Sequence, residues 1–379
     1  MKVMRAFLLM AAAVVLANAA DLKPVFPKNA AKPIGPYTPG ISAGAYFYVS
    51  GQGARDAAGK LPATFEEQTR QCLQNVKDIL EADGLAMQNV VWAQVFVQDM
   101  KQLATLDKVY ASFFPKEPPA RSMVGVNKMP GETPVEIAVV AVRDLKQRKA
   151  ISLAPPTAPV SNAVQVGDRV YISGVLGLDP KNKVPAQPRQ QVDALVSQMK
   201  AVLAKAGLEM RDMAYAHVYI DGSMPMKVLG EILTEVLPSE TARAVTQTAG
   251  IPRGAHIEIS GVASRKAKRE GDCTSIEDTI YCPSVAGTIE RALTRVQENL
   301  NIAKVDLSRV VVSNVFLDDI QHFAAMNNVY GGAFGKWLPT RVTLQPTARA
   351  EELNLAPSTN SPVPKTNAPR AQISVIAVR

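Results

Sequence analysis

The sequence has 379 residues, 47% hydrophobic and 20% charged, with 42 lysines and arginines against 34 aspartates and glutamates. A chain of this length is too long for one ordinary core and suits two or three domains of about 100 to 150 residues each. The basic runs at 146–149 and 265–269 contain no aromatic residue, whereas a nucleic-acid surface would interleave aromatics with positive charge. We therefore interpret these runs as connectors and expect no nucleic-acid partner.

The first residues form a separate segment. Lys2 and Arg5 precede an apolar run at 6–17, and Ala17-Asn18-Ala19 offers the small residues that signal peptidase reads. The run is too short to span a bilayer core of about 30 Å. We expect a signal peptide at 1–19, cleavage near Ala19, no membrane span, and a periplasmic or secreted protein. A buried N-terminal helix is the alternative.

Four kinds of segment then recur three times in the same order. Each copy starts with a hairpin, continues with apolar residues at helical spacing and an apolar strand, and reaches an arginine after a turn. A final strand closes the copy, as in "PVEIAVVAVR" at 134–143, "HIEISGVASR" at 256–265 and "AQISVIAVR" at 371–379. Each copy therefore predicts two strands, a helix, a strand, a helix and a closing hairpin.

The repeats divide the mature chain into three units, at 20–148, 149–265 and 266–379. Thr64 and Glu67 predict a capping box at the start of the first helix. The third unit is longer than the others between its arginine and its last strand, by a stretch rich in Pro, Ser and Asn at about 348–369. We interpret this stretch as a loop inserted into the closing hairpin.

One strand of each unit is apolar on both faces, as in "VVWAQVFV" at 90–97. Such a strand must be covered on both sides, and the helices of one small unit cover only one side. We therefore predict an α+β fold in which three sheets close into a ring with the helices outside. The chain would then be a monomeric pseudo-trimer.

Two cysteines flank the hairpin of the third unit. If Glu277 and Asp278 form a two-residue turn, Cys273 lies opposite Cys282 in a non-hydrogen-bonded pair, within disulfide reach. Export would favour oxidation. We predict a disulfide, with two buried thiols as the alternative, and expect Cys72 to pack in the core of the first unit.

Five motifs of the first unit identify a family likeness: "IGPYTPG" at 34–40, "VSGQ" at 49–52, "VYASFF" at 109–114, "PPARS" at 118–122 and "VEIAVVAVR" at 135–143. In these motifs the unit resembles the RidA/YjgF family of enamine and imine deaminases. The resemblance is weaker in the second and third units. Members of this family are trimers of a chorismate-mutase-like fold with sites in the clefts between subunits, so the resemblance implies such a trimer fused into one chain.

The resemblance also implies site residues. In the family an arginine grips the carboxylate of a small 2-imino acid, which suits a planar bidentate guanidinium. The matching positions are Arg121, Arg243 and Arg341. Other implied binding residues are Tyr37, Ser50, Asn327 and its counterpart Asp107. The best preserved cleft would combine Tyr37 with Arg121 or Arg341. No cofactor and no metal are implied, and His217, His256 and His322 have no partner at metal-ligand spacing.

The family also uses a glutamate on the closing strand to place the attacking water. We expect its position to hold Ala138, Ser260 and Ser374, none of which can act as a base near neutral pH. Glu136 and Glu258 lie two residues earlier on the same strand face, so they could substitute or be structural. Gln372 takes that place in the third unit.

Two classes of function follow from the resemblance. The first is hydrolysis of a small reactive 2-imino or enamine acid to a 2-oxo acid and ammonia. The alternative is a cell-envelope protein without catalysis, which either binds small carboxylates or acts as a scaffold. Endoribonuclease activity, described for some relatives, is not expected because the charge of the chain is mild.

Overall fold

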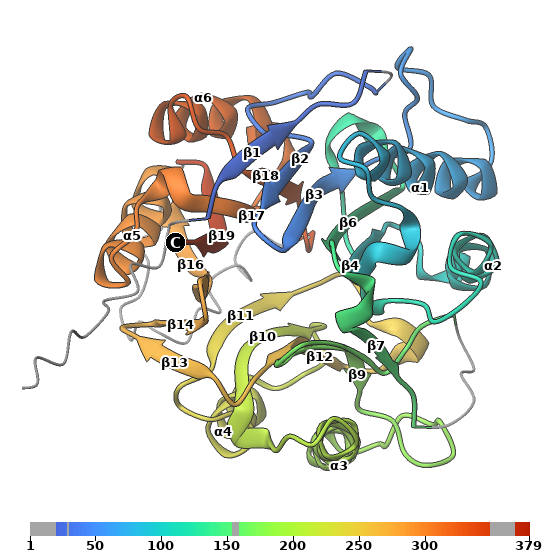
Figure 1. The fold of residues 1–379 in the computed structure, drawn as a ribbon. Helices are drawn as coiled ribbons and strands as arrows, with labels where there is room; N and C mark the ends of the chain where they lie inside the picture. Colours follow the sequence, from blue (N-terminus) through green and yellow to red (C-terminus); the bar gives the residue numbers. More distant parts are fainter. Residues whose placement is uncertain (1–19, 29, 154–158, 349–367) are drawn as a thin grey trace, which may run out of the picture.

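The computed structural model describes residues 20–28, 30–153, 159–348 and 368–379 (Figure 1). The expected signal peptide at 1–19 and almost all of the expected loop at 348–369 lie outside these residues. Within the described residues, no helix is both long enough and apolar enough to cross a membrane.

The first unit is a six-stranded sheet with two helices. Its elements are β1 (Leu22–Val25), β2 (Gly40–Ala43), β3 (Tyr46–Gln52), α1 (Phe65–Glu81), β4 (Val90–Val97), α2 (Leu103–Phe113), β5 (Ala120–Gly125) and β6 (Val135–Val142). The strand order is β1-β2-β3-β6-β4-β5. The apolar strand β4 is buried along its whole length, as its sequence predicts.

The second unit repeats this arrangement. Its elements are β7 (Arg148–Ile151), β8 (Ala163–Val166), β9 (Arg169–Leu176), α3 (Pro188–Lys205), β10 (Met213–Ile220), α4 (Met226–Glu235), β11 (Ala242–Gln247) and β12 (Ile257–Ala263). The strand order, β11-β10-β12-β9-β8-β7, is the same as in the first unit when read from the opposite edge.

The third unit adds one strand to the pattern. Its elements are β13 (Ala267–Glu270), β14 (Cys273–Ile276), β15 (Thr279–Tyr281), β16 (Val285–Thr288), α5 (Ile289–Ile302), β17 (Val310–Leu317), α6 (Phe323–Phe334), β18 (Thr340–Leu344) and β19 (Arg370–Val378). Ile276 pairs with Thr279 across the predicted turn. Beyond this hairpin, Cys273 and Cys282 are joined by a disulfide, with their Cα atoms 4.2 Å apart.

The closing strands do not form the hairpin that the sequence suggests. β5 pairs with β4 in parallel, and β6 pairs with the other side of β4 in antiparallel. The reason is α2, which connects β4 to β5 as a crossover and so places β5 at the edge of the sheet. β17, β18 and β19 follow the same rule. The edge strands β1, β7 and β13 are a further difference, since the repeats did not predict them.

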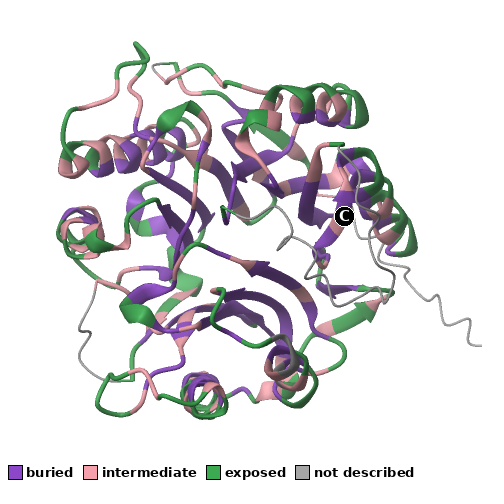
Figure 2. Ribbon diagram, turned by 180° about the vertical axis from the view of Figure 1, so that it is seen from behind, coloured by how far each residue is buried: buried purple, intermediate pink, exposed green. Residues whose placement is uncertain are grey.

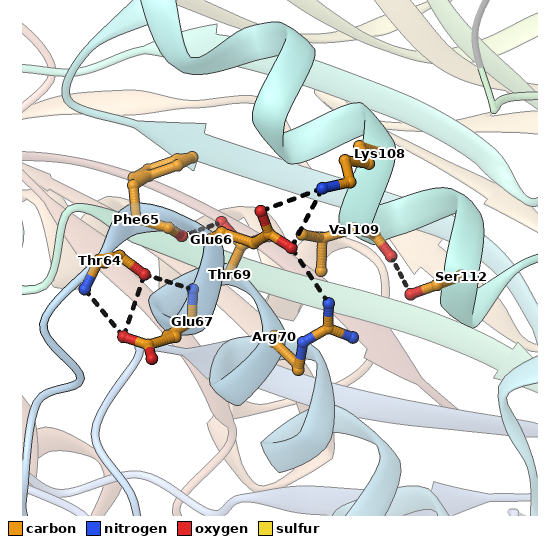
Figure 3. Close-up of polar contacts among 9 residues, drawn as sticks. All are labelled: Thr64, Phe65, Glu66, Glu67, Thr69, Arg70, Lys108, Val109 and Ser112. Atoms are coloured by element: carbon orange, nitrogen blue, oxygen red, sulfur yellow. Dashed lines mark hydrogen bonds and ion pairs between the residues drawn. The ribbon is translucent and has the colours of Figure 1, made fainter.

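The start of α1 shows how local sequence fixes an element. The Thr64 side chain accepts a hydrogen bond from the Glu67 backbone N–H, and the Glu67 side chain accepts one from the Thr64 N–H (Figure 3). This confirms the predicted capping box, a feature worth about 1 kcal/mol. The adjacent Glu66 carboxylate contacts Lys108 of α2 at 3.2 Å and Arg70 at 3.5 Å, so the two helices also meet at an exposed ion-pair cluster.

The inner faces of the three sheets share one core, as the ring prediction requires. Trp92 of the first unit, Tyr171 of the second, and Tyr281 and Ile376 of the third belong to the same buried cluster. The helices lie around the outside, where each covers the outer face of its own sheet (Figures 1 and 2). The α+β class and the three repeated sheets are therefore confirmed. Burial of each large apolar side chain contributes about 1.5 to 3 kcal/mol, so separating the units would expose a large apolar surface.

A small polar cluster lies inside this shared core. The Gln94 amide lies 2.9 Å from Nδ1 of His217, and the Tyr215 hydroxyl lies 2.6 Å from Nε2. Burial lowers the pKa of His217 to about 3, so the imidazole is neutral at physiological pH. Gln94, His217 and Asn314 occupy equivalent positions of β4, β10 and β17, each opposite the closing strand of its own unit.

Candidate functional site

The three repeat arginines all lie where one unit meets the next. β5, with Arg121, packs against β9 of the second unit, and β18, with Arg341, packs against β3 of the first unit. β11 carries Arg243, whose carbonyl oxygen accepts a hydrogen bond from the Ser284 N–H at 3.0 Å. We call the contacts at Arg121, Arg243 and Arg341 the first, second and third seams. They join units one and two, two and three, and three and one.

The third seam encloses a cavity of about 370 Å³. Its walls come mainly from the first unit, and the third unit adds a few residues from α6 and β18. The lining residues are Ala31, Lys32, Ile34, Tyr37, Gly51, Gln52, Gly53, Ala54, Arg55, Ala57, Ala58, Gly59, Asn75, Pro130, Gly131, Thr133, Glu136, Phe323, Arg341 and Thr343. A site at a seam therefore combines Arg341 of one unit with Tyr37 and Glu136 of another.

Arg341 is a buried cation surrounded by aromatic rings. Its side chain is only 4% exposed, and its guanidinium carbon lies 5.3 Å from the ring centre of Tyr37 and 4.9 Å from that of Tyr330. Such contacts stabilise a cation, while burial lowers the pKa of Arg341. Among the described residues, no carboxylate lies within ion-pair distance of Arg341. This guanidinium is therefore available to an external anion.

Asn327 of α6 lies beside this arginine under the backbone of Gly35. A Cβ atom added to Gly35 would lie 2.6 Å from Nη2 of Arg341 and 2.8 Å from Oδ1 of Asn327, so a larger residue there would displace these side chains. The Oδ1 atom is buried and has no hydrogen-bond partner among the described residues. A buried acceptor without a partner costs about 1 to 3 kcal/mol, and Asn327 is not among the lining residues of the cavity.

Glu136 of β6 supplies the acid of the cavity. It is 6% exposed, and this burial raises its pKa to about 8, although the charge of Arg341 and a hydrogen bond from the Thr343 backbone oppose the shift. The carboxyl group lies against Gly51, where an added Cβ would be 2.0 Å from Oε1. A carboxyl group with a pKa near neutrality can exchange a proton with a bound molecule at physiological pH.

The residues expected at the family's acid position lie away from the cavity. Ala138, Ser260 and Ser374 do not line it; they pair with Gln94, His217 and Asn314 next to the shared core. Residues two apart on one strand face are separated by about 7 Å, so Glu136 and Ala138 reach different places along β6. The acid that lines the cavity is Glu136, one of the two substitutes that the sequence left open, and its catalytic role stays a prediction.

The first seam contains the same parts but pairs its arginine internally. Arg121 Nη2 lies 2.7 Å from Oδ1 of Asp107, and the guanidinium stacks over Tyr110 at 4.8 Å. Glu258 accepts hydrogen bonds from the Ser122 hydroxyl at 2.6 Å and from the Met123 N–H at 3.2 Å. Burial nevertheless raises its pKa to about 7. Asp107 thus gives Arg121 the carboxylate that Arg341 lacks.

At the second seam Arg243 is hydrogen-bonded within the protein, and a glutamine takes the place of the seam glutamate. Arg243 donates hydrogen bonds to the carbonyl oxygens of Leu237 at 3.1 Å and Pro238 at 2.7 Å. Gln372 stands where the other seams have a glutamate, and its amide bonds Thr246 and Ser284. The polar groups of this seam, charged in Arg243 and neutral in Gln372, are therefore hydrogen-bonded within the protein.

The remaining predicted residue and several unpredicted ones have structural roles around the cavity. The Ser50 hydroxyl donates to the carbonyl of Pro39 at 3.1 Å and accepts from Gln52 at 2.8 Å, so it supports the cavity wall without lining it. Asn75 of α1 donates to the carbonyls of Gly53 and Arg55 at 2.9 and 2.8 Å. A signal for Asn75 was present in the sequence, because it is a polar residue on the apolar face of a helix.

Within the part of the chain that the structure describes, no three His, Cys, Asp or Glu side chains are grouped so that they could hold a metal ion. The charged groups that line the cavity include the guanidinium of Arg341 and the carboxyl group of Glu136.

Comparisons with known proteins agree with the repeats. The family model described as Endoribonuclease L-PSP matches residues 27–143, 151–265 and 274–354. A 2-iminobutanoate/2-iminopropanoate deaminase of Escherichia coli K12 is 39% identical over 125 residues, which are 32% of this chain and 98% of the relative. A RutC family protein of Pyrococcus horikoshii is 38% identical over 122 residues, 32% of this chain and 97% of the relative.

Two solved structures each match about one third of this chain. The crystal structure of the YjgF gene product of E. coli is 39% identical, covers 32% of this chain and 99% of its own, and has a TM-score of 0.31. E. coli TdcF with bound serine is 35% identical, with coverages of 32% and 99% and a TM-score of 0.31. On the three matches of the family model, the chain belongs to the Endoribonuclease L-PSP family, the RidA/YjgF family that its motifs resemble, and contains that domain three times.

Proposed function

We propose that the third seam hydrolyses a small 2-imino acid to the corresponding 2-oxo acid and ammonia. The observation that carries the proposal is that one cavity holds a buried guanidinium, Arg341, which has no ion-pair partner among the described residues, and a carboxyl group with a pKa of about 8, Glu136. A relative that matches one unit at 39% identity is a 2-iminobutanoate/2-iminopropanoate deaminase, which supports the same chemistry.

Arg341 would bind the substrate carboxylate through two charge-assisted hydrogen bonds. The ionised Glu136 would take a proton from a water molecule as the water oxygen attacks C2 of the protonated imine. Glu136 then gives that proton to the nitrogen of the resulting carbinolamine. The C–N bond breaks and ammonia leaves as Glu136 takes the proton of the C2 hydroxyl group, whose oxygen becomes the carbonyl oxygen of the 2-oxo acid. Glu136 passes this proton to the ammonia or to solvent and is ionised again, so the protonated imine and water give a 2-oxo acid and ammonium. General base catalysis of this kind contributes about 10² to 10⁴-fold.

This role predicts a pH dependence. Glu136 must be ionised to accept the proton, and its pKa of about 8 leaves about one tenth of the free protein ionised at pH 7. The ratio kcat/KM should therefore rise as the pH increases through about 8. A positively charged imine in the cavity lowers the pKa of Glu136, so kcat should reach its plateau at a lower pH than kcat/KM.

A second function is favoured by the same carboxyl group. While Glu136 is protonated it donates a hydrogen bond, and together with Arg341 it would then hold a 2-oxo acid without reacting. The protein would in that case be a small-carboxylate binder. This alternative shares the Arg341 clamp and differs in the absence of turnover.

One experiment separates the two functions. Ammonia release from 2-iminopropionate, generated by an amino-acid oxidase, would be followed with the wild type, with Glu136→Gln and with Glu258→Gln. We expect Glu136→Gln to lose about 10² to 10⁴-fold of the catalysed rate and Glu258→Gln, the equivalent residue of the first seam, to retain it. A wild-type rate equal to the rate in buffer would reject the enzyme. Heat protection by 2-oxobutyrate that depends on Arg341 would then support the binder.

The proposal places this activity outside the cytoplasm, in a chain that works as a monomer. Support for export comes from the leader sequence at 1–19 and from the disulfide between Cys273 and Cys282, since disulfides persist in oxidising compartments. Support for a monomer comes from the shared core, which already covers the inner faces of all three sheets. Fractionation of cells and light scattering of the purified protein would test the two points.

A further inference from the structure

The cavity of the third seam is larger than the smallest imino acids require. 2-Iminopropionate has about six non-hydrogen atoms, as many as benzene, which an apolar cavity of about 150 Å³ can hold. The cavity here measures about 370 Å³. A substrate of that size would leave most of the space to water, so the cavity can take a longer side chain.

The charges of the lining indicate what kind of side chain it is. Three of the lining residues, Lys32, Arg55 and Arg341, are cationic, and the only acid among the described lining residues is Glu136. No carboxylate of a described residue forms an ion pair with Lys32 or Arg55. One substrate carboxylate satisfies Arg341 alone. The two further cations favour a second negative charge on the ligand.

Arg55 is held in place at the cavity wall. Its Nε atom donates to the Gly131 carbonyl at 3.0 Å, and its Nη1 atom donates to the Gly59 carbonyl at 2.9 Å. The Nη2 nitrogen has no hydrogen-bond partner among the described residues. A guanidinium fixed by two backbone contacts loses little conformational entropy when it binds an anion.

The segment 31–37 connects the two ends of the cavity. Tyr37 lies against Arg341, whereas Ile34 lies near Gly131, to which Arg55 is bonded: a Cβ atom added to Gly131 would be 3.7 Å from Ile34 and 3.8 Å from Arg55. Lys32 lies two residues before Ile34 and is exposed. The cavity thus has an inner end at Arg341 and an outer end at Arg55 and Lys32.

We infer that the cavity takes a 2-imino dicarboxylate, with the carboxylate next to the imine on Arg341 and the side-chain carboxylate on Arg55 and Lys32. This inference rests on the proposed function and names its substrate class. The reaction stays the same: water adds to C2, the C–N bond breaks, and a 2-oxo dicarboxylate and ammonia are formed. Arg55 and Lys32 bind the substrate and determine specificity, and they take no part in proton transfer.

The test compares imines of equal reactivity that differ in their side chains. The imines of alanine, leucine, glutamate and 2-aminoadipate would be generated by amino-acid oxidases, and ammonia release would be measured for each. We expect kcat/KM for a dicarboxylate to exceed that for the alanine imine by about tenfold or more, because its second carboxylate gains charge-assisted hydrogen bonds from Arg55 and Lys32. A leucine imine that reacts as well as both dicarboxylates would overturn the inference.

Variants and direct binding complete the test. Arg55→Met and Lys32→Met should each reduce the preference for the dicarboxylate over the alanine imine, and Lys60→Met, which removes a charge from the same loop outside the cavity, serves as the control. Arg55→Met also removes the hydrogen bonds of Arg55 to the backbone and could unfold the loop locally. Lys32→Met keeps these bonds, so a reduced preference in this variant cannot be caused by their loss. An unchanged preference in both cavity variants would reject the assignment.

Binding distinguishes this inference from the proposed function. Calorimetry with 2-oxoglutarate, 2-oxoadipate and 2-oxobutyrate requires no turnover. Tighter binding of a dicarboxylate, weakened by Arg55→Met, would support the cavity specificity even if no imine is hydrolysed. Hydrolysis of the alanine imine combined with equal binding of the oxo acids would support the enzyme and reject the dicarboxylate.

Discussion

At the third seam Arg341 lies over Tyr330 at 4.9 Å, and at the first seam Arg121 lies over Tyr110 at 4.8 Å. The two arginines are equally buried, at 4% and 8% exposed. The helix residue beside them differs: Asn327 at the third seam corresponds to Asp107 at the first, where it forms an ion pair with Arg121. The two helix residues differ only in that asparagine has an amide NH2 group where aspartate has a carboxylate oxygen. This difference separates Arg341, which is free to bind a ligand, from Arg121, whose charge is neutralised within the protein.

The seam acids show the same contrast on a smaller scale. Glu136 and Glu258 are both buried and both lie against a glycine, Gly51 or Gly174, that leaves no room for a Cβ atom. Glu258 accepts a side-chain hydrogen bond from Ser122 in addition to its backbone bond, and its pKa of about 7 is lower than the value of about 8 for Glu136. The repeats thus preserve the geometry of a site while changing how its charges are satisfied.

The most direct test of the difference between the two seams is to replace each arginine. Arg341→Met should reduce kcat/KM by about 10³-fold, or about 4 kcal/mol, because the substrate carboxylate loses its bidentate partner. Arg121→Met should retain activity but lower the free energy of unfolding by about 1 to 3 kcal/mol, because it strands the Asp107 carboxylate. Steady-state kinetics would measure kcat/KM of both variants, and denaturant titration would measure their free energies of unfolding. Equal losses of activity would mean that both seams work.

Replacing the seam glutamates tests the electrostatic difference. Above pH 4.5 an unfolded Glu136 releases its proton, whereas the folded one keeps it to about pH 8, so the wild type loses stability as the pH rises through this window. Glu136→Gln removes that loss and should be more stable than the wild type at pH 8, by roughly 3 to 4 kcal/mol.

Glu258→Gln provides the matched control for that experiment. The gain in the free energy of unfolding of this variant over the wild type should be smaller by about 1 kcal/mol and should be complete near pH 7. The reason is that the pKa of Glu258 is lower than that of Glu136 by about one. Thermal unfolding of both variants between pH 4.5 and 9 would measure the difference. A Glu136→Gln variant that follows the wild type at every pH would show that the Glu136 carboxyl group is not desolvated.

The sequence predicts the three arginines and the packing of the units, but not which charged groups meet at each seam. Repetition identifies the three arginines, and the doubly apolar strand β4 indicates that the units must cover one another. The choice of the acid stayed open because residues 136 and 138 share a strand face, and only the packing of two units decides which one reaches a cavity. The ion pair of Asp107 was equally hidden, since it joins α2 to β5 across a fold whose closing strands are not the hairpin that their order suggests.

Exchanging the helix residues sharpens the comparison directly. Asn327→Asp places a carboxylate beside Arg341 and should weaken the binding of a 2-oxo acid by about 30-fold, or about 2 kcal/mol, because the ligand must displace an internal ion pair. The same change should stabilise the unliganded protein. Calorimetry would measure the weaker binding, and thermal unfolding would measure the higher stability of the unliganded variant. The reverse change, Asp107→Asn, should destabilise the protein, and a gain in stability there would show that the Asp107 ion pair is unfavourable.

The smallest predicted effect concerns His217 in the shared core. It separates the contribution of the seam glutamates to the pH dependence of stability from the other contributions. Acidification protonates Glu136 and Glu258 and so favours the folded state, which means that a loss of stability below pH 6.5 must arise elsewhere. His217 is such a source: its pKa is about 3 in the folded protein, so below its ordinary value of 6.5 only the unfolded chain gains the proton.

His217→Gln introduces the side chain that the first unit has at the equivalent position, Gln94. Between pH 6.5 and 5 the wild type should lose about 2 kcal/mol that the variant does not lose, whereas the two should differ by a constant amount between pH 7 and 9, where the imidazole is neutral in both states. Denaturant titrations across this range would measure both parts. Parallel curves down to pH 5 would mean that His217 accepts a proton within the folded ring, and the polar cluster around it would then have to accommodate a charge.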